Sequence, residues 1–280
     1  MGKLDQLKSQ LMAKGLWAKK SLGQNFLIDD KVLDQIVEAA DLYEGDHVIE
    51  VGPGTGFLTE RLIQKAGTVM SVELDRNMVG ILERRFGTAR NLQIVNQDIL
   101  KFETRNLKSE EYKVVANIPY YITSPLLKHF LQSKNRPTLM VLLVQKEVAE
   151  KVCGKTGKSL ITIETQLFGQ PEIIGIVKAS SFYPAPKVDS AILKIKVYDK
   201  PLVPADQLKD FLRIVKFGFS QKRKMLNNTL GAGLHKKPAE VTELLKKIGI
   251  DPSQRAENLD IDDWKKLARS LLVVSLKINC

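Results

Sequence analysis

Between Lys31 and Val144 the chain alternates short apolar segments of strand length with amphipathic segments of helix length. The helix-length segments, such as Phe57 to Lys65 and Met78 to Phe86, space their apolar residues three and four apart. This alternation predicts a parallel sheet with helices on both faces, because parallel strands need long crossover connections. The five predicted strands are His47 to Val51, Thr68 to Glu73, Leu92 to Asn96, Tyr112 to Asn117 and Thr138 to Val144.

Two further segments of strand length follow a helical stretch from Glu147 to Phe168. They run from Glu172 to Lys178 and from Val188 to Val197, and the connection between them permits an antiparallel hairpin but not a parallel crossover. We therefore expect an α/β fold of the Rossmann-like type, with a mostly parallel seven-stranded sheet.

The last eighty residues have a different pattern. Pro201 and Pro204 mark a linker, and the chain beyond Asp206 has the pattern of helices and turns, with an apolar tail at Leu271 to Val274 that could end a helix. We predict two domains, a larger α/β domain over residues 1–200 and a small all-α domain over residues 201–280.

Composition excludes several classes of protein. Hydrophobic residues make up 44% of the 280 residues and charged residues 27%, and no apolar run approaches the length of a membrane span. Cys153, Cys280 and the three scattered histidines form no paired-ligand pattern, so no metal site is expected. The first twenty residues lack the features of a secretion signal, although leucines at helical spacing leave an organelle-targeting peptide open. We expect a cytoplasmic protein with no membrane partner, acting as a monomer.

A strong positive charge points to a polyanionic partner. The formal net charge is +11, and a basic surface attracts nucleic acid and gains free energy from counterion release. The region from Lys209 to Lys237 holds eight basic residues opposed only by Asp210. This clustering favours an RNA or DNA surface over an uninvolved basic face.

A glycine loop follows the first predicted strand, in the order Glu50-Val51-Gly52-Pro53-Gly54-Thr55-Gly56. Glycines at this edge of an open α/β sheet let the backbone turn tightly and approach a nucleotide. The dinucleotide fingerprint needs its third glycine one position later than Gly56, so the spacing disfavours NAD. A plain strand-to-helix turn is the alternative.

Two acidic residues occupy the same edge. Glu73 ends the second predicted strand about 20 residues beyond the first glycine, where a carboxylate accepts both ribose hydroxyls of an adenosine. Asp98 follows the third strand and could accept from the adenine amine of the same cofactor, although an isolated loop aspartate is commonplace. Together with Gly52 and Gly54 they predict a binding site for an adenosine-containing cofactor.

The fourth predicted strand ends in Asn117-Ile118-Pro119-Tyr120, which points to methyl transfer onto an aromatic amine. Such an amine is a poor nucleophile, and an enzyme must hold it and aim its lone pair. The side-chain oxygen of Asn117 and the carbonyl of Ile118 could accept from the amine, with Pro119 stiffening the turn and Tyr120 stacking on the base. The alternative is a strand-terminating turn with a half-buried tyrosine.

These residues resemble one family, the KsgA-type small-subunit ribosomal RNA adenine dimethyltransferases. The resemblance covers nearly the whole chain from Lys20 onward. The sequence differs mildly from the family pattern at Lys19 to Leu22 and at Lys222, where many members carry arginine. The matching stretches, besides the glycine loop and Asn117 to Tyr120, are Gly23 to Leu27, Phe182 to Ser190, Phe219 to Lys224 and Arg255 to Leu259.

The resemblance implies a class I methyltransferase that uses S-adenosyl-L-methionine and dimethylates two adjacent adenosines in the 3′-terminal hairpin of small-subunit (16S) rRNA within a pre-30S particle. It implies that Phe182 helps to hold the target base, for which a loop anchor packed on the sheet is the alternative. It also implies cofactor and RNA contacts: Asn25, Leu27, Gly52, Glu73, Asp98 and Asn117 line the cofactor site, and Lys222, Arg223 and Lys224 contact phosphates.

Two rival functions remain open. The first is a large-subunit RNA adenine methyltransferase that confers antibiotic resistance, because it shares the glycine loop and the Asn117 to Tyr120 turn. The stretch from Arg255 to Leu259 and the basic C-terminal region favour the small subunit. The second is a non-catalytic RNA-binding or transcription-assisting relative. The presence of Glu73, Asp98 and Asn117 together counts against it, since a retired site has no physical reason to keep them.

Overall fold

The computed structural model describes residues 2–13, 15, 17, 23–104, 107, 109 and 111–276, and the side chains among them up to residue 271. The basic stretch Lys19 to Leu22 and Cys280 lie outside these residues. The chain forms two compact units, one of Met1–Ala149 with Gln170–Val197, and one of Glu150–Gly169 with Tyr198–Cys280.

The first unit is built on a seven-stranded sheet in the order β4-β3-β2-β5-β6-β9-β7. Neighbouring strands from β4 to β6 pair in parallel, and β9 pairs antiparallel with β6, which confirms the predicted mostly parallel sheet. β7 and β9, the two predicted strands that follow the helical stretch, are hydrogen-bonded neighbours, as expected for strands joined by a short connection. The strands are β2 (His47–Val51), β3 (Thr68–Glu73), β4 (Leu92–Asn96), β5 (Lys113–Asn117), β6 (Leu139–Gln145), β7 (Gly169–Val177) and β9 (Ser190–Val197).

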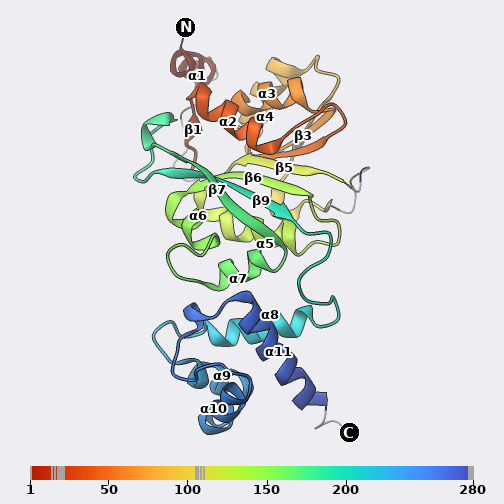
Figure 1. Ribbon diagram of the computed structural model, residues 1–280. Coiled ribbons are helices and arrows are strands. Elements are labelled where there is room, and N and C mark those ends of the chain that lie inside the picture. The colour runs from red at the N-terminus through yellow and green to blue at the C-terminus, as the bar shows by residue number, and fades with distance from the viewer. Residues whose placement is uncertain are drawn as a thin grey trace. The chain divides into compact units, whose positions relative to one another are not determined.

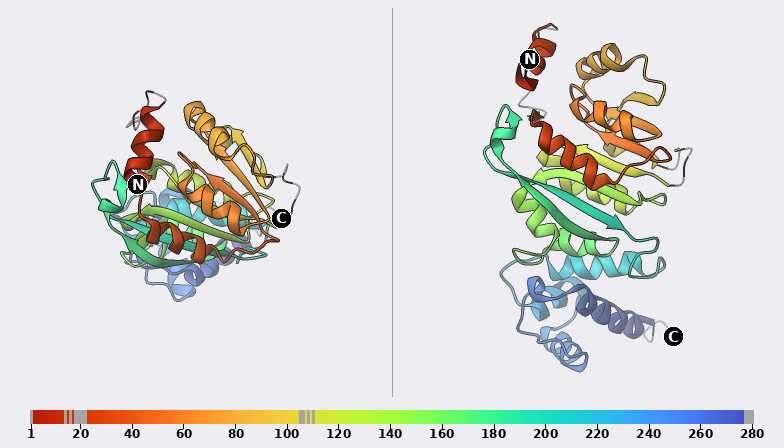
Figure 2. Two further views of the ribbon diagram at one scale, coloured as in Figure 1. Left: turned by 90° about the horizontal axis from the view of Figure 1, so that it is seen from above. Right: turned by 45° about the horizontal axis from the view of Figure 1, so that its top comes forward.

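Helices cover both faces of this sheet. Figure 1 and Figure 2 show α2 (Asp30–Ala40), α3 (Phe57–Lys65) and α4 (Arg76–Phe86) on one side and α5 (Thr123–Leu131) on the other. The side chain of Asp29 caps α2 by accepting from the backbone N–H groups of Lys31 and Val32, and Asp75 caps α4. These caps start each helix just beyond a loop at the sheet edge, so the loops stay free to form a site.

A two-stranded pairing completes the unit, and no local sequence pattern indicated it. β1 (Phe26–Leu27) pairs antiparallel with β8 (Phe182–Tyr183), so that Leu27 lies opposite Phe182. The hydroxyl of Ser181 also donates to the carboxylate of Asp29 at 2.9 Å. This pairing brings the N-terminal segment Gly23 to Leu27 beside the loop from Phe182 to Ser190.

The N-terminal residues form a helix that packs into the first unit. α1 (Lys3–Met12) buries Leu7 and Leu11 in the same apolar core as α2 and α3, and Lys3 forms an ion pair with Asp30 at 3.1 Å. The helical spacing of its leucines therefore serves core packing.

The second unit is helical. Trp264 is fully buried at its centre, and an added Cβ on Gly218 would lie 2.2 Å from the indole, so only glycine fits that helix crossing. α11 runs through the apolar tail at Leu271 to Val274. The helices are α7 (Leu160–Gln166), α8 (Leu208–Gly218), α9 (Leu226–Leu234), α10 (Pro238–Lys247) and α11 (Ile261–Leu276), while α6 (Lys146–Val152) crosses from one unit to the other.

The division into units differs from the predicted domains in one respect. The chain passes into the second unit at Tyr198, close to the predicted boundary at residue 200, but residues 150–169 also group with the helical unit. Backbone hydrogen bonds explain this, since the N–H groups of Tyr198 and Leu202 donate to the carbonyls of Phe168 and Leu167. An amphipathic segment placed between two strands gives no sign of which unit it will join.

Within the described residues, no helix is both long and apolar enough to cross a membrane. Over the same part of the chain, no cluster of three or more histidine, cysteine or acidic side chains could hold a metal ion.

Candidate active site

A cavity of about 230 Å³ lies at the carboxyl edge of the sheet, where parallel α/β sheets bind ligands. Residues of the segment before β1 and of the ends of β2, β3, β4 and β5 form its wall. Among its lining residues are all of the residues predicted to bind the cofactor and, except for Phe182, all of those predicted to hold the target base: Asn25, Leu27, Gly52, Gly54, Glu73, Asp98, Asn117, Pro119 and Tyr120.

The glycine loop forms one wall of this cavity. Gly52 and Gly54 adopt φ values of 65° and 58°, which disfavour every residue with a Cβ. A Cβ built on Gly52 would find only the carbonyl oxygen of Asn117, at 3.9 Å, so it would project into open space. The loop therefore leaves room for a ligand to approach the backbone between Gly52 and Asn117.

Glu73 lies beside this loop, with 7% of its surface exposed. Its two carboxylate oxygens accept from the backbone N–H groups of Asp75 at 2.8 Å and Gly54 at 3.1 Å. Burial raises the pKa of Glu73, and the two backbone donors partly oppose that rise. Glu73 lines the cavity, and a carboxylate oxygen can accept more than one hydrogen bond, so the group fits a pair of ribose hydroxyls.

Asp98 lies on the same wall, one strand further along the sheet. One of its oxygens accepts from the N–H of Leu100 at 2.9 Å, which caps the short 3₁₀ helix η2 (Ile99–Lys101). The cap fixes the direction of the side chain, and its second oxygen is available to an amine donor. The chemistry of these residues fits the adenosine half of S-adenosylmethionine.

Glu50 is a residue of this cavity that the sequence analysis did not single out. It is fully buried, and one of its oxygens accepts from the hydroxyls of Thr59 at 2.7 Å and Ser71 at 2.6 Å. The other oxygen is buried without a hydrogen-bond partner. Burial raises the pKa of Glu50 to about 7, against the two hydroxyl donors. Its position one residue before Val51-Gly52 was the available signal.

Asn117 ends β5 at the opposite wall of the cavity. Its side-chain N–H donates to the backbone carbonyl of Asn25 at 3.3 Å, and the side chain of Asn25 donates to the carbonyl of Gly23 at 3.2 Å. With its amide nitrogen used in this way, Asn117 keeps its side-chain oxygen as a free acceptor. The segment before β1 thus orients the Asn117 amide.

Tyr120 is held by a residue far away in the chain. Its phenol forms a hydrogen bond of 2.7 Å with the hydroxyl of Ser190 at the start of β9, and burial raises the pKa of the phenol. Pro119 precedes Tyr120 as the first residue of the turn that becomes the 3₁₀ helix η4 (Tyr120–Ile122). Sequence reasoning named Tyr120 but missed Ser190, because no local pattern links the two.

Phe182 lies outside the cavity wall. It is 3% exposed, belongs to the apolar core and pairs with Leu27 through the backbone. This is the packing expected of a loop anchor, which was the alternative to a contact with the base. The β1–β8 pairing explains it, because it places Phe182 opposite Leu27, which belongs to the same apolar core.

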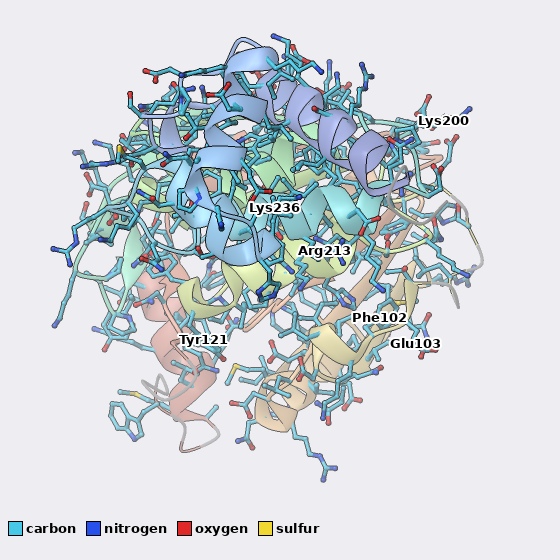
Figure 3. All side chains as sticks on the ribbon, turned by 90° about the horizontal axis from the view of Figure 1, so that it is seen from below. Phe102, Glu103, Tyr121, Lys200, Arg213 and Lys236 are labelled. Carbon is cyan, nitrogen blue, oxygen red and sulfur yellow. The ribbon has the colours of Figure 1, made fainter. Side chains whose placement is uncertain are left out.

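The predicted phosphate-binding residues lie in the second unit. Lys222, Arg223 and Lys224 are exposed in the segment between α8 and α9, within a turn that is closed by a hydrogen bond from the N–H of Lys224 to the carbonyl of Gln221. Figure 3 marks three further basic residues of this unit, Lys200, Arg213 and Lys236.

Comparison with known proteins gives a consistent result. Residues 15–272 match the family described as Ribosomal RNA adenine dimethylase. Ribosomal RNA small subunit methyltransferase A of Dehalococcoides mccartyi (strain CBDB1) is 43% identical over 94% of this chain and 91% of its own length. The protein of that name from Desulfitobacterium hafniense (strain Y51) is 40% identical over 94% of this chain and 95% of its own.

Two solved structures share the architecture. A dimethyladenosine transferase from Plasmodium falciparum superposes with a TM-score of 0.75 at 28% identity, covering 90% of this chain and 98% of its own. The 23S rRNA methyltransferase ErmE superposes with a TM-score of 0.73 at 30% identity, covering 88% and 99%. Both comparisons confirm the predicted fold class.

Proposed function

This chain belongs to the ribosomal RNA adenine dimethylase family, and we propose that it transfers methyl groups from S-adenosylmethionine to the exocyclic amines of two adjacent adenosines in small-subunit rRNA. The observation that carries the proposal is the arrangement of one cavity. Its two walls hold Glu73 and Asp98, suited to an adenosine cofactor, and Asn117 with a free amide oxygen, suited to an acceptor amine.

Cofactor binding would fall to the glycine wall. Gly52 and Gly54 would let the donor approach the backbone, Glu73 would accept from its ribose hydroxyls and Asp98 from its adenine amine. Bound there, S-adenosylmethionine supplies an electrophilic methyl carbon on a positively charged sulfur. The site needs no positively charged side chain for this, because the donor brings the charge with it.

The acceptor side would hold and aim the amine. The side-chain oxygen of Asn117 and the carbonyl oxygen of Ile118 would accept its two N–H groups, which directs the nitrogen lone pair toward the donor. Tyr120, fixed by Ser190, would stack on the extruded adenine. Methyl transfer would form the N–C bond as the sulfur–methyl bond breaks, leaving neutral S-adenosylhomocysteine and a positively charged nitrogen whose acidic proton solvent can remove. The monomethyl amine keeps one N–H, so in a second round, with a second donor molecule, one of these two oxygens would accept from it while the first methyl group lies beside the other.

The choice of RNA rests on the relatives. Those from Dehalococcoides and Desulfitobacterium act, by their names, on the small subunit, at 40% to 43% identity over most of both chains. ErmE, a 23S rRNA methyltransferase, is less similar at 30% identity. We propose that this chain works in the cytoplasm as a monomer on a pre-30S particle. Its basic segment from Lys222 to Lys224 would contact phosphates.

One experiment tests the proposal. The protein is incubated with labelled S-adenosylmethionine and, separately, with immature small subunits, naked small-subunit RNA and large-subunit RNA, and the labelled bases are mapped. We expect dimethyladenosine at two adjacent positions near the 3′ end of the small-subunit RNA. Label confined to large-subunit RNA would overturn the substrate. RNA binding with no label on any of these RNAs would favour the non-catalytic relative.

A further inference from the structure

Two consecutive tyrosines in η4 have opposite surroundings. Tyr120 is half-buried and tied to Ser190, whereas Tyr121 is 62% exposed, and both line the cavity. Successive residues of a 3₁₀ helix are rotated by about 120°, so the anchoring of one ring inward directs the next ring outward. Figure 3 labels Tyr121 on the face of the molecule seen there. The cavity therefore has an exposed aromatic ring beside its acceptor wall.

The ring of Tyr121 packs beside Gly23. An added Cβ on Gly23 would lie 3.4 Å and 3.5 Å from two ring carbons of Tyr121, and 3.5 Å from the Cβ of Pro119. Gly23, with φ of 61°, thus fits between Pro119 and Tyr121. The same segment positions Asn117 through Asn25, so the Tyr121 ring and the amide of Asn117 share one support. A supported ring loses little conformational entropy when a second ring stacks on it.

We infer that Tyr121 is a stacking platform for the RNA base next to the extruded adenine. Removing one base from a stack leaves its neighbour without a partner, which costs a few kcal/mol. An aromatic side chain at the mouth of the pocket offsets that cost, and such stacking accepts any base because every base has a π-face. Tyr121 would therefore lower the cost of presenting the target to Asn117 without touching the reacting atoms.

This inference rests on the proposed function and adds to it. When two adjacent adenosines are methylated in turn, the neighbour of the first target is the second target. Tyr121 would hold that second base at the mouth while the first is modified. It acts as a positioning residue, with its effect on RNA binding rather than on the donor.

The test compares Tyr121→Ala and Tyr121→Phe with a matched control, Tyr43→Ala. Tyr43 is also 62% exposed but precedes β2, at the opposite edge of the sheet. For Tyr121→Ala we expect the KM for the RNA hairpin to rise about tenfold, equivalent to ~1.4 kcal/mol, with the Kd for S-adenosylmethionine unchanged. Tyr121→Phe, which keeps an aromatic ring, should have the KM of the wild type, and so should Tyr43→Ala.

A second measurement is independent of turnover. In a Trp17→Phe background, where only the buried Trp264 remains as a tryptophan, Tyr121→Trp introduces an exposed fluorophore that a stacked base quenches when the hairpin binds, and the background protein without this change gives the signal of Trp264. We expect quenching by the intact hairpin and much less by one with an abasic nucleotide beside the target. An unchanged KM in Tyr121→Ala, or a weakened Kd for S-adenosylmethionine, would overturn the inference. Absence of methylation by the wild type would instead refute the proposed function, while the quenching would still report on stacking.

Discussion

The hydroxyl groups of Tyr120 and Ser190 lie 2.7 Å apart, although 70 positions separate them in the chain. This hydrogen bond joins the turn after β5 to the start of β9, two strands that both neighbour β6. It ties the ring that faces the cavity to the rigid part of the sheet.

We expect Tyr120→Phe and Ser190→Ala each to lower the free energy of unfolding by about 1 kcal/mol. Each change removes one of the two hydroxyl groups and leaves the other without its hydrogen-bond partner. The double variant should be destabilised by less than the sum, since both changes remove one interaction. Urea unfolding of the four proteins measures this. Strict additivity would mean that the bond contributes nothing to the folded state.

Asn117→Ala should lower kcat for methyl transfer by about 100-fold or more, because the amine loses the acceptor that aims its lone pair. RNA retention should be nearly unchanged, since binding energy comes mainly from phosphate contacts. Single-turnover kinetics and filter binding separate the two effects. Asn91→Ala is a suitable control, because the Asn91 side chain donates to the backbone carbonyls of Ile63 and Ala66, which do not line the cavity. Transfer at the wild-type rate by Asn117→Ala would refute the role of this side chain.

Gly52→Ala should abolish binding of S-adenosylmethionine, because the new methyl group would occupy space in the cavity. It should also cost about 1 to 2 kcal/mol of stability through the left-handed backbone. Gly249→Ala is the matched control, with φ of 77° and nothing within 4 Å of the added Cβ. Calorimetric titration with the donor should separate the two variants, and equal donor affinity in both would show that the glycine wall is not the binding surface.

Glu50 predicts a dependence of stability on pH. Burial raises its pKa to about 7, from an ordinary value of 4.5, so between these values the folded protein keeps a proton that the unfolded chain releases. The stabilising contribution of Glu50 is therefore complete below pH 4.5 and is lost as the pH rises through about 7. Relative to Glu50→Gln, the wild type should lose on the order of 3 kcal/mol across that window.

Denaturant unfolding of both proteins at several pH values measures this difference. Gln keeps an oxygen for Thr59 and Ser71 and does not titrate, which makes it the appropriate reference. A difference that stays constant, or that grows in favour of the wild type at high pH, would contradict the raised pKa.

Replacing Lys222, Arg223 and Lys224 with alanine should weaken RNA binding and flatten its salt dependence. Each lost phosphate contact reduces the slope of log K against log salt by about 0.7 to 0.9, so three lost contacts reduce it by about 2. Lys265→Ala with Lys266→Ala is the control, because these lysines pair with Asp262 and Asp263. An unchanged slope in the triple variant would remove the segment from the RNA interface.

Much of the site could be predicted from local pattern. β2, β3 and β4 begin and end at the predicted residues, since an apolar segment of strand length can be recognised in consecutive residues. Gly52, Glu73, Asp98 and Asn117 each end or follow such a strand, and parallel strands bring those ends to one edge. Their meeting in one cavity follows from the order of strands along the sheet.

Tertiary structure alone decided the contacts that orient these groups. The pairing of β1 with β8 joins residues more than 150 positions apart, and it buries Phe182 while it brings Asn25 to Asn117. Neither the Ser190 anchor of Tyr120 nor the grouping of residues 150–169 with the helical unit has a local signature. Periodicity specifies which face of an element is buried, whereas the partner on that face depends on packing between distant segments.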